Sequence, residues 1–181
     1  AEVLDLSGRA TSVLKLKDGV VLNSAVICKE HHELLLISDI GRILRLPVNE
    51  ATLPLMGKLA QGPMTMRRLP GEELIGAITP EQPQLLLMSS AGALVRINAS
   101  ELRYGQRGDL GTIAVSLSNE TDRLVGFSSL DDITGIVTSN GRHGRFDPNS
   151  LETVEPGAEF SDQLSLQKDE TILELISTIH P

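Results

Sequence analysis

Arginines that recur at one position are the residues best suited to do chemistry in this 181-residue sequence. Arg45, Arg96 and Arg145 each stand four residues after a glycine, and they are 51 and 49 residues apart. A guanidinium is always positively charged, and its planar fork of donors matches the oxygen atoms of phosphate and carboxylate groups. Arginines at a fixed spacing can therefore line a track for a regularly spaced phosphate backbone. The alternative is that each arginine forms an ion pair that locks two neighbouring units together.

Further basic residues lie in or beside the expected turns, where binding residues concentrate. Lys58 and the Arg67-Arg68 pair could equally be solvated surface charges. His143 lies in a basic turn and could titrate near an anion. The full set of candidate phosphate-contacting residues is Arg42, Arg45, Lys58, Arg67, Arg68, Arg96, Arg103, Arg107, Arg142 and Arg145.

Residues that could catalyse a reaction are not arranged to do so. The sequence has no Ser-His-Asp order, no nucleophile elbow and no phosphate-cradling Gly-x-x-x-x-Gly-Lys loop. His31 and His32 stand beside Cys28, but neighbours on a strand point to opposite faces and cannot easily bind one metal ion. Glu72-Glu73 and Asp131-Asp132 are paired acids in expected turns. We predict no catalytic residue, no metal and no cofactor in this chain.

Composition limits the kinds of partner. The net charge of −8 is uneven: it is 0 over residues 1–80, −2 over 81–150 and −6 over 151–181. The first 150 residues can therefore still bind an anion, and the acidic end either competes with that anion or is a solvated edge. Four aromatic residues and no Trp leave no platform for stacking unpaired bases. A single cysteine and apolar runs of at most four residues suit a cytoplasmic protein without membrane spans.

The sequence contains an internal repeat. Residues 34–46, 85–97 and 134–146 align without gaps, and a second apolar element follows each of them. A copy of that second element, Leu22–Ser24, comes before the first full unit. We therefore divide the chain into a half-unit and three repeats, which are residues 1–33, 34–84, 85–132 and 133–181.

Each repeat has the pattern of a β-hairpin. An apolar run is followed by a turn that ends in glycine, such as Ser38–Gly41, and then by residues that alternate between two faces. Leu44 and Leu46 share one face, which places Arg45 on the opposite, exposed one. No stretch of about 12 residues has helical periodicity. We predict an all-β, propeller-like fold of three to four four-stranded blades, each of about 50 residues.

The repeat resembles a blade of a known family. Residues 34–46, followed by Ala60-Gln61-Gly62, Arg67-Arg68-Leu69 and Leu74-Ile75-Gly76, are similar to one blade of the C-terminal domain of bacterial type II topoisomerase A subunits, the family of the A subunits of DNA gyrase and topoisomerase IV. The resemblance extends from about Gly8 to Ser177. It implies a β-pinwheel whose basic rim binds and bends double-stranded DNA near the nucleoid. It also implies two protein partners, which are the remainder of the A subunit, to which the domain would be joined, and the separate ATPase subunit.

The sequence departs from this family at its basic box, a glutamine and two arginines followed by glycines and a lysine. The nearest stretch, Gln106–Gly111, keeps Gln106, Arg107 and the glycines, but it lacks the second arginine and the lysine and contains Asp109. Fewer cations predict weaker phosphate contact. The DNA-cleaving tyrosine of the family belongs to another domain, so Tyr104 is not assigned that role.

Two other classes of function remain open. A propeller that binds proteins and no DNA is favoured by the net charge of −8. A propeller of the chromosome-condensation-regulator type has a similar period, but that family tends to repeat a Trp and this chain has none.

Overall fold

The fold is all-β, as the repeat pattern predicts. The structure, a computed structural model, describes residues 14–57, 59–129 and 134–176. These residues form three sheets and two short 3-10 turns, η1 (Ala99–Glu101) and η2 (Pro148–Ser150). No helix among them is long and apolar enough to cross a membrane.

The first sheet is built on the predicted hairpin. Strands β1 (Glu33–Ser38) and β2 (Arg42–Pro47) pair antiparallel, with Leu36 opposite Leu44. Gly41 has a φ of +82°, the left-handed conformation that its turn requires. The sheet has the order β3-β1-β2-β6, in which β3 is Leu74–Ile78 and β6 is Thr112–Ile113.

The other two sheets repeat the hairpin with a third strand beside its first strand. The second has the order β10-β5-β4-β7, and β11 also pairs with β5. The third has the order β12-β8-β9. The bounds of their strands are β4 Gln84–Ser89, β5 Ala93–Asn98, β7 Leu124–Ser129, β8 Thr134–Thr138, β9 His143–Phe146, β10 Thr153–Val154, β11 Asp162–Gln163 and β12 Ile172–Ile176.

The second and third repeats each supply a strand to the sheet of the repeat before them, which the sequence pattern does not predict. The outer strand β6 comes from the repeat after the one whose hairpin it covers, and β11 covers β5 in the same way. Just beyond these strands, the Ala114 N–H donates to the Gly41 carbonyl at 2.8 Å, and the Leu164 N–H donates to the Gly92 carbonyl at 2.9 Å. The first and second hairpins are thus completed by main-chain bonds from the following unit, whereas the third sheet has three strands, β12-β8-β9, among the described residues.

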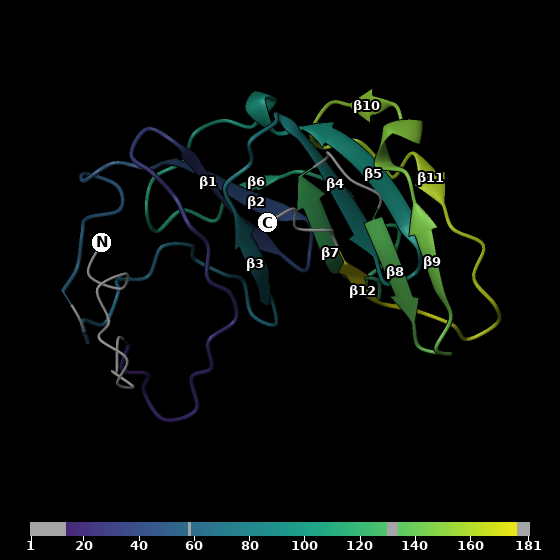
Figure 1. Ribbon diagram of the computed structural model, residues 1–181, viewed down its shortest axis with the longest axis horizontal. Helices are drawn as coiled ribbons and strands as arrows, with labels where there is room; N and C mark the ends of the chain where they lie inside the picture. The colour runs from purple at the N-terminus through teal and green to yellow at the C-terminus, as the bar shows by residue number, and fades with distance from the viewer. Residues whose placement is uncertain (1–13, 58, 130–133, 177–181) are drawn as a thin grey trace, which may run out of the picture.

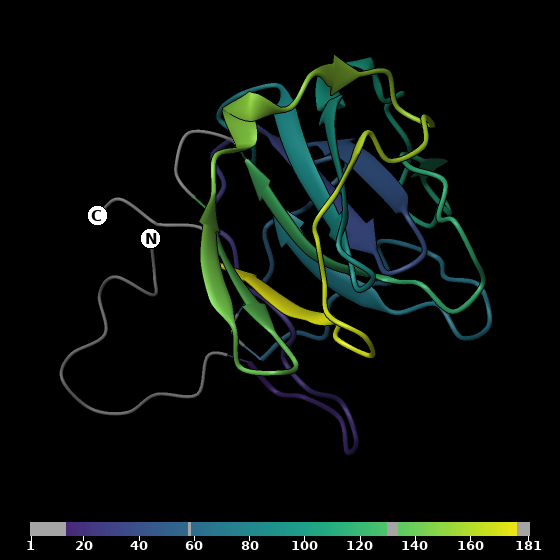
Figure 2. The same ribbon diagram turned by 90° about the vertical axis from the view of Figure 1, so that its right-hand side faces the viewer.

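Apolar side chains fill the spaces between the sheets. One cluster, which includes Leu35, Ile37, Leu85 and Leu87, joins the first sheet to the second, and another joins the second to the third. The strands β3, β7 and β12 stack closely because glycines on two of them leave room for a large neighbour. A Cβ on Gly76 would lie 2.6 Å from the Phe127 ring. The three sheets therefore fan out side by side, in chain order, like propeller blades (Figures 1 and 2).

Candidate functional site

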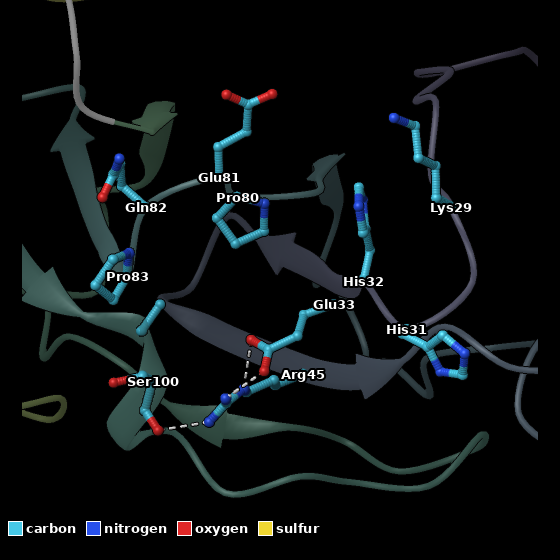
Figure 3. Close-up of a pocket in the computed structure, with 11 residues that line it drawn as sticks. Lys29, His31, His32, Glu33, Arg45, Pro80, Glu81, Gln82, Pro83 and Ser100 are labelled. Atoms are coloured by element: carbon cyan, nitrogen blue, oxygen red, sulfur yellow. Dashed lines mark hydrogen bonds and ion pairs between the residues drawn. The ribbon is translucent and has the colours of Figure 1, made fainter.

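Arg45 is buried, so its predicted exposure is wrong. Only 8% of the residue is exposed, because the chain around η1 in the next repeat covers it. Its guanidinium donates from Nε to Glu33 Oε2 at 3.0 Å and from Nη2 to Glu33 Oε1 at 2.5 Å. Nη1 donates to the carbonyl oxygen of Ser100 at 2.5 Å (Figure 3). It also donates to the carbonyl oxygen of Leu102 at 2.8 Å. Arg45 therefore holds its own blade together and joins it to the next.

Tyr104 completes this cluster from the following repeat. Its hydroxyl donates to Glu33, and its ring centroid lies 4.1 Å from Arg45 Cζ, a cation–π distance. The hydrogen bonds from Arg45, the largest cause, and from Tyr104 lower the pKa of Glu33. The bond to Glu33 and then burial raise the pKa of Tyr104. The Arg45–Glu33 pair therefore stays ionised at neutral pH, and Tyr104 stays a neutral phenol.

Arg96 occupies the equivalent place on β5 with far fewer contacts. Its Nη1 donates to the Leu151 carbonyl at 3.3 Å, as Arg45 does to the Leu102 carbonyl. Leu102 and Leu151 each follow a 3-10 turn, so they are the same position in consecutive repeats. The residue is partly buried, and its Nε is buried without a hydrogen-bond partner among the described residues.

Arg145, the third member of the series, is exposed on β9. Its side chain makes no ion pair or hydrogen bond with the residues that the structure describes. The three arginines are equivalent in the sequence repeat but differ in the structure: Arg45 is buried, Arg96 is partly buried and Arg145 is exposed.

Four other predicted residues gather around the outer edge of the first sheet. Arg42 lies on β2, where it is opposite Ile113 of β6. The Arg67 N–H donates to the Asp109 carbonyl at 2.9 Å, and Arg103 Nε donates to Thr112 Oγ1 at 3.3 Å. None of them forms an ion pair with a carboxylate among the described residues, and three are exposed. We call this set the rim cluster, and its members are Arg42, Arg67, Arg103 and Arg107.

The loop that carries Arg107 is ordered by its own aspartate. Asp109 Oδ2 accepts the Gln106 N–H at 2.8 Å, and the Gly108 N–H donates to the Thr65 carbonyl at 2.7 Å. The carboxylate that replaces a cation of the family's box is therefore used inside the turn. This contact also brings Arg107 close to the segment that carries Arg67.

The remaining predicted cations are paired or undescribed. Arg68 lies 3.6 Å from a Glu73 carboxylate oxygen, and Arg142 Nη1 lies 2.6 Å from Glu170 Oε2. The N–H of Gln167, the hydroxyl of Thr138 and the charge of Arg142 hold the pKa of Glu170 below its usual value. Lys58 lies outside the described residues.

A pocket of about 560 Å³ opens beside the Arg45 cluster and includes both adjacent histidines (Figure 3). Lys29, His31, His32 and Glu81 line it, together with Glu33 and Arg45 at its base. Across the described part of the chain, no group of three or more His, Cys, Asp or Glu side chains is placed to hold a metal ion. Glu72, one of the paired acids, caps a turn by accepting the Leu69 N–H at 2.6 Å.

Glu33 is a member of the Arg45 cluster that the repeat pattern did not reveal. It stands one position before the first aligned run, and Gln84 stands one position before the second. Extending the alignment by that residue would have shown an acid twelve positions before Arg45 and an amide twelve positions before Arg96.

The comparisons agree on one family. The family described as DNA gyrase C-terminal domain, beta-propeller, matches residues 32–80 and 83–131. The DNA gyrase A subunit of Mycobacterium bovis (strain BCG / Pasteur 1173P2) is 30% identical over 131 residues, which are 71% of this chain and 16% of that protein. The DNA topoisomerase 4 A subunit of Synechocystis sp. is 28% identical over 134 residues, which are 68% of this chain and 15% of that protein.

Solved structures have the same fold. A DNA gyrase A C-terminal domain aligns with a TM-score of 0.77 and 20% identity, covering 90% of this chain and 56% of that one. The C-terminal domain of DNA topoisomerase IV aligns with a TM-score of 0.78 and 15% identity, covering 91% of this chain and 52% of that one.

The fold and the repeats define a propeller-like domain of type II topoisomerase A subunits. The chain belongs to the family of DNA gyrase C-terminal domains, which confirms the resemblance found in the repeats. It spans only 15% to 16% of the length of these two curated relatives.

Proposed function

We propose that this domain binds and bends double-stranded DNA as a non-catalytic accessory domain of a topoisomerase A subunit. The observation that carries the proposal is the rim cluster, whose four arginines come from three segments of the chain and have no carboxylate partner among the described residues. Family membership supplies the second support. The protein partners that we propose are the remainder of the A subunit and the separate ATPase subunit. The proposed location is the bacterial cytoplasm, at the nucleoid.

The mechanism is contact with the DNA backbone. Arginines that neutralise phosphates release condensed counterions, which favours binding without reading any base. Specificity then comes from DNA shape and deformability, because a duplex that bends easily reaches more of the rim at a smaller cost. The described residues offer one exposed aromatic, Tyr104, so stacking on unpaired bases has no part in this proposal.

Duplex binding measured as a function of salt tests the proposal. Replacing Arg67, Arg103 and Arg107 together by Ala should lower the slope of log K against log salt by about 2.7, or about 0.9 for each lost phosphate contact. Lys168→Ala removes an exposed cation far along the chain from the cluster and should leave the slope unchanged. An unchanged slope in a folded triple variant would refute the assignment of the cluster.

A propeller that binds proteins is the second candidate. It is favoured by apolar side chains that stand in solvent before and after the first hairpin, such as Ile27 at 89% and Leu55 at 92% exposure. If the wild-type chain shows no duplex binding at about 50 mM salt, where phosphate contacts are stronger than at physiological salt, this function replaces DNA binding.

A further inference from the structure

In two consecutive repeats, the arginines at the repeated position, Arg45 and Arg96, face different partners. Glu33 on β1 lies opposite Pro47, two residues after Arg45, and Gln84 on β4 lies opposite Asn98, two residues after Arg96. The backbone therefore places Gln84 against Arg96 as it places Glu33 against Arg45. The charged partner of the first unit is replaced by a neutral amide in the second.

The aromatic partner is replaced as well. Tyr104 forms a parallel bridge with Arg45, and Thr153 forms the matching parallel pair with Arg96. Threonine has no ring to stack on a guanidinium and a much shorter reach than tyrosine. Arg96 thus keeps the main-chain contact of its position, through Leu151, while losing both side chains that satisfy Arg45.

The consequence is a guanidinium with unused binding capacity. Its buried Nε has no partner among the described residues, and leaving such a donor unsatisfied costs free energy. The side chain is only partly buried, so solvent reaches the rest of the group. Glu152, next to Leu151, is exposed and forms no ion pair with Arg96. An anion that accepts a hydrogen bond from Nε would remove the cost of this unpaired donor. It would also neutralise the positive charge of the guanidinium.

We propose that Arg96 is a phosphate-binding residue, whose fork takes from a DNA phosphate the charge-assisted hydrogen bonds that Arg45 takes from Glu33. Because Gln84 is neutral, it leaves the guanidinium of Arg96 free to bind a phosphate. An acid at position 84 would pair with the guanidinium and prevent that binding. The inference rests on the proposed function and deepens it, because it separates the arginines of the repeated position into one that joins blades and one that binds ligand.

Gln84→Glu tests the inference without touching Arg96. The new carboxylate should pair with the guanidinium and lower the salt slope of duplex binding by about 0.9, the share of one phosphate. The variant should also melt at a higher temperature, since a buried donor gains an acceptor. The matched control is Glu33→Gln, the reverse change at the equivalent position, which should lower the melting temperature and leave the salt slope no smaller.

Inorganic phosphate provides a readout that does not depend on DNA. At constant ionic strength, phosphate in place of chloride should raise the melting temperature of the wild type, because a ligand that binds the folded state stabilises it. Gln84→Glu and Arg96→Gln should each lose most of that increase. Arg96→Lys keeps the charge without the fork and should retain only part of it.

The outcomes separate the two proposals. If the wild type binds duplex but Gln84→Glu has the same slope and the same response to phosphate, the assignment of Arg96 is wrong and the proposed function stands. If the wild type binds no duplex and yet Gln84→Glu abolishes the response to phosphate, the anion site stands and DNA binding is wrong.

Discussion

At the scale of single residues, the availability of a cation depends on its neighbours more than on its type. Among the described residues, the side chain of Arg45 makes five hydrogen bonds and that of Arg96 makes one. The carboxylate of Glu33 accounts for much of the difference, because it both neutralises the guanidinium and fills two of its donors. An arginine so satisfied gains little from a phosphate, whereas an unsatisfied one gains a partner.

The Glu33–Arg45 pair predicts how stability depends on pH. Glu33 has a folded-state pKa below its ordinary value of 4.5, so its stabilising contribution is complete above that value and is lost as the pH falls through the lowered pKa. Glu33→Gln should therefore be less stable than the wild type near neutral pH, and the difference should shrink on acidification. Urea unfolding at several pH values measures this. A difference that is constant with pH would contradict the ionic nature of the pair.

At the scale of the elements, the strands β6 and β11 make the first and second blades depend on the repeat that follows each of them. Strand β6 has only two residues, Thr112 and Ile113, yet it covers the outer edge of β2. Gly111 allows this close approach, because its φ is +77° and an added Cβ would lie 2.6 Å from the Ile43 carbonyl oxygen. The loop of the rim cluster is anchored at this point.

Two glycines in that loop form a matched test. Gly111→Ala should destabilise the domain by about 2–3 kcal/mol, because it adds a collision with the backbone of β2 to the strain of a positive φ. Gly108→Ala has a φ of +93° but open space around its Cβ, so it should cost only about 1 kcal/mol. Urea unfolding of both variants gives the comparison. Equal losses would mean that the contact between Gly111 and β2 does not hold β6 in place.

At the scale of the whole molecule, the acidic C-terminal segment packs on the second sheet, beside the strand that carries Arg96. Residues 151–181 carry −6, and their strands β10 and β11 both pair with β5, the strand of Arg96. Glu152, Glu155, Glu159 and Asp162 are all exposed on this segment. Charges in solvent act over about 8–10 Å at physiological salt, so acids this close to β5 can oppose an approaching phosphate.

Neutralising these acids should strengthen DNA binding and increase bending. We expect a variant with Glu152, Glu155 and Glu159 changed to Gln and Asp162 changed to Asn to bind duplex more tightly at low salt, with the advantage shrinking as salt screens the charges. Binding isotherms at two salt concentrations, with the change in duplex bending, measure the effect. If the variant and the wild type bind duplex with equal affinity at both salt concentrations, the acidic segment is a solvated edge.

The repeated units, their hairpins and the all-β class follow from local patterns in the sequence. Alternating residues and turn glycines such as Gly41 act over a few positions, so a reader of the sequence can place them. The strand that one repeat supplies to the preceding sheet is different, because β6 pairs with residues about 70 positions earlier and has too short a pattern to recognise.

The state of each arginine was decided only by the tertiary structure. Strand alternation alone predicts that Arg45 is exposed, but the turn at Ser100 and Leu102, 55 and 57 residues further along the chain, folds over it. Arg145 stands at the aligned position, four residues after its glycine, and remains in solvent. Alternation tells which face a side chain leaves from, whereas burial depends on which distant segment packs against that face, and this is a property of the assembled blades.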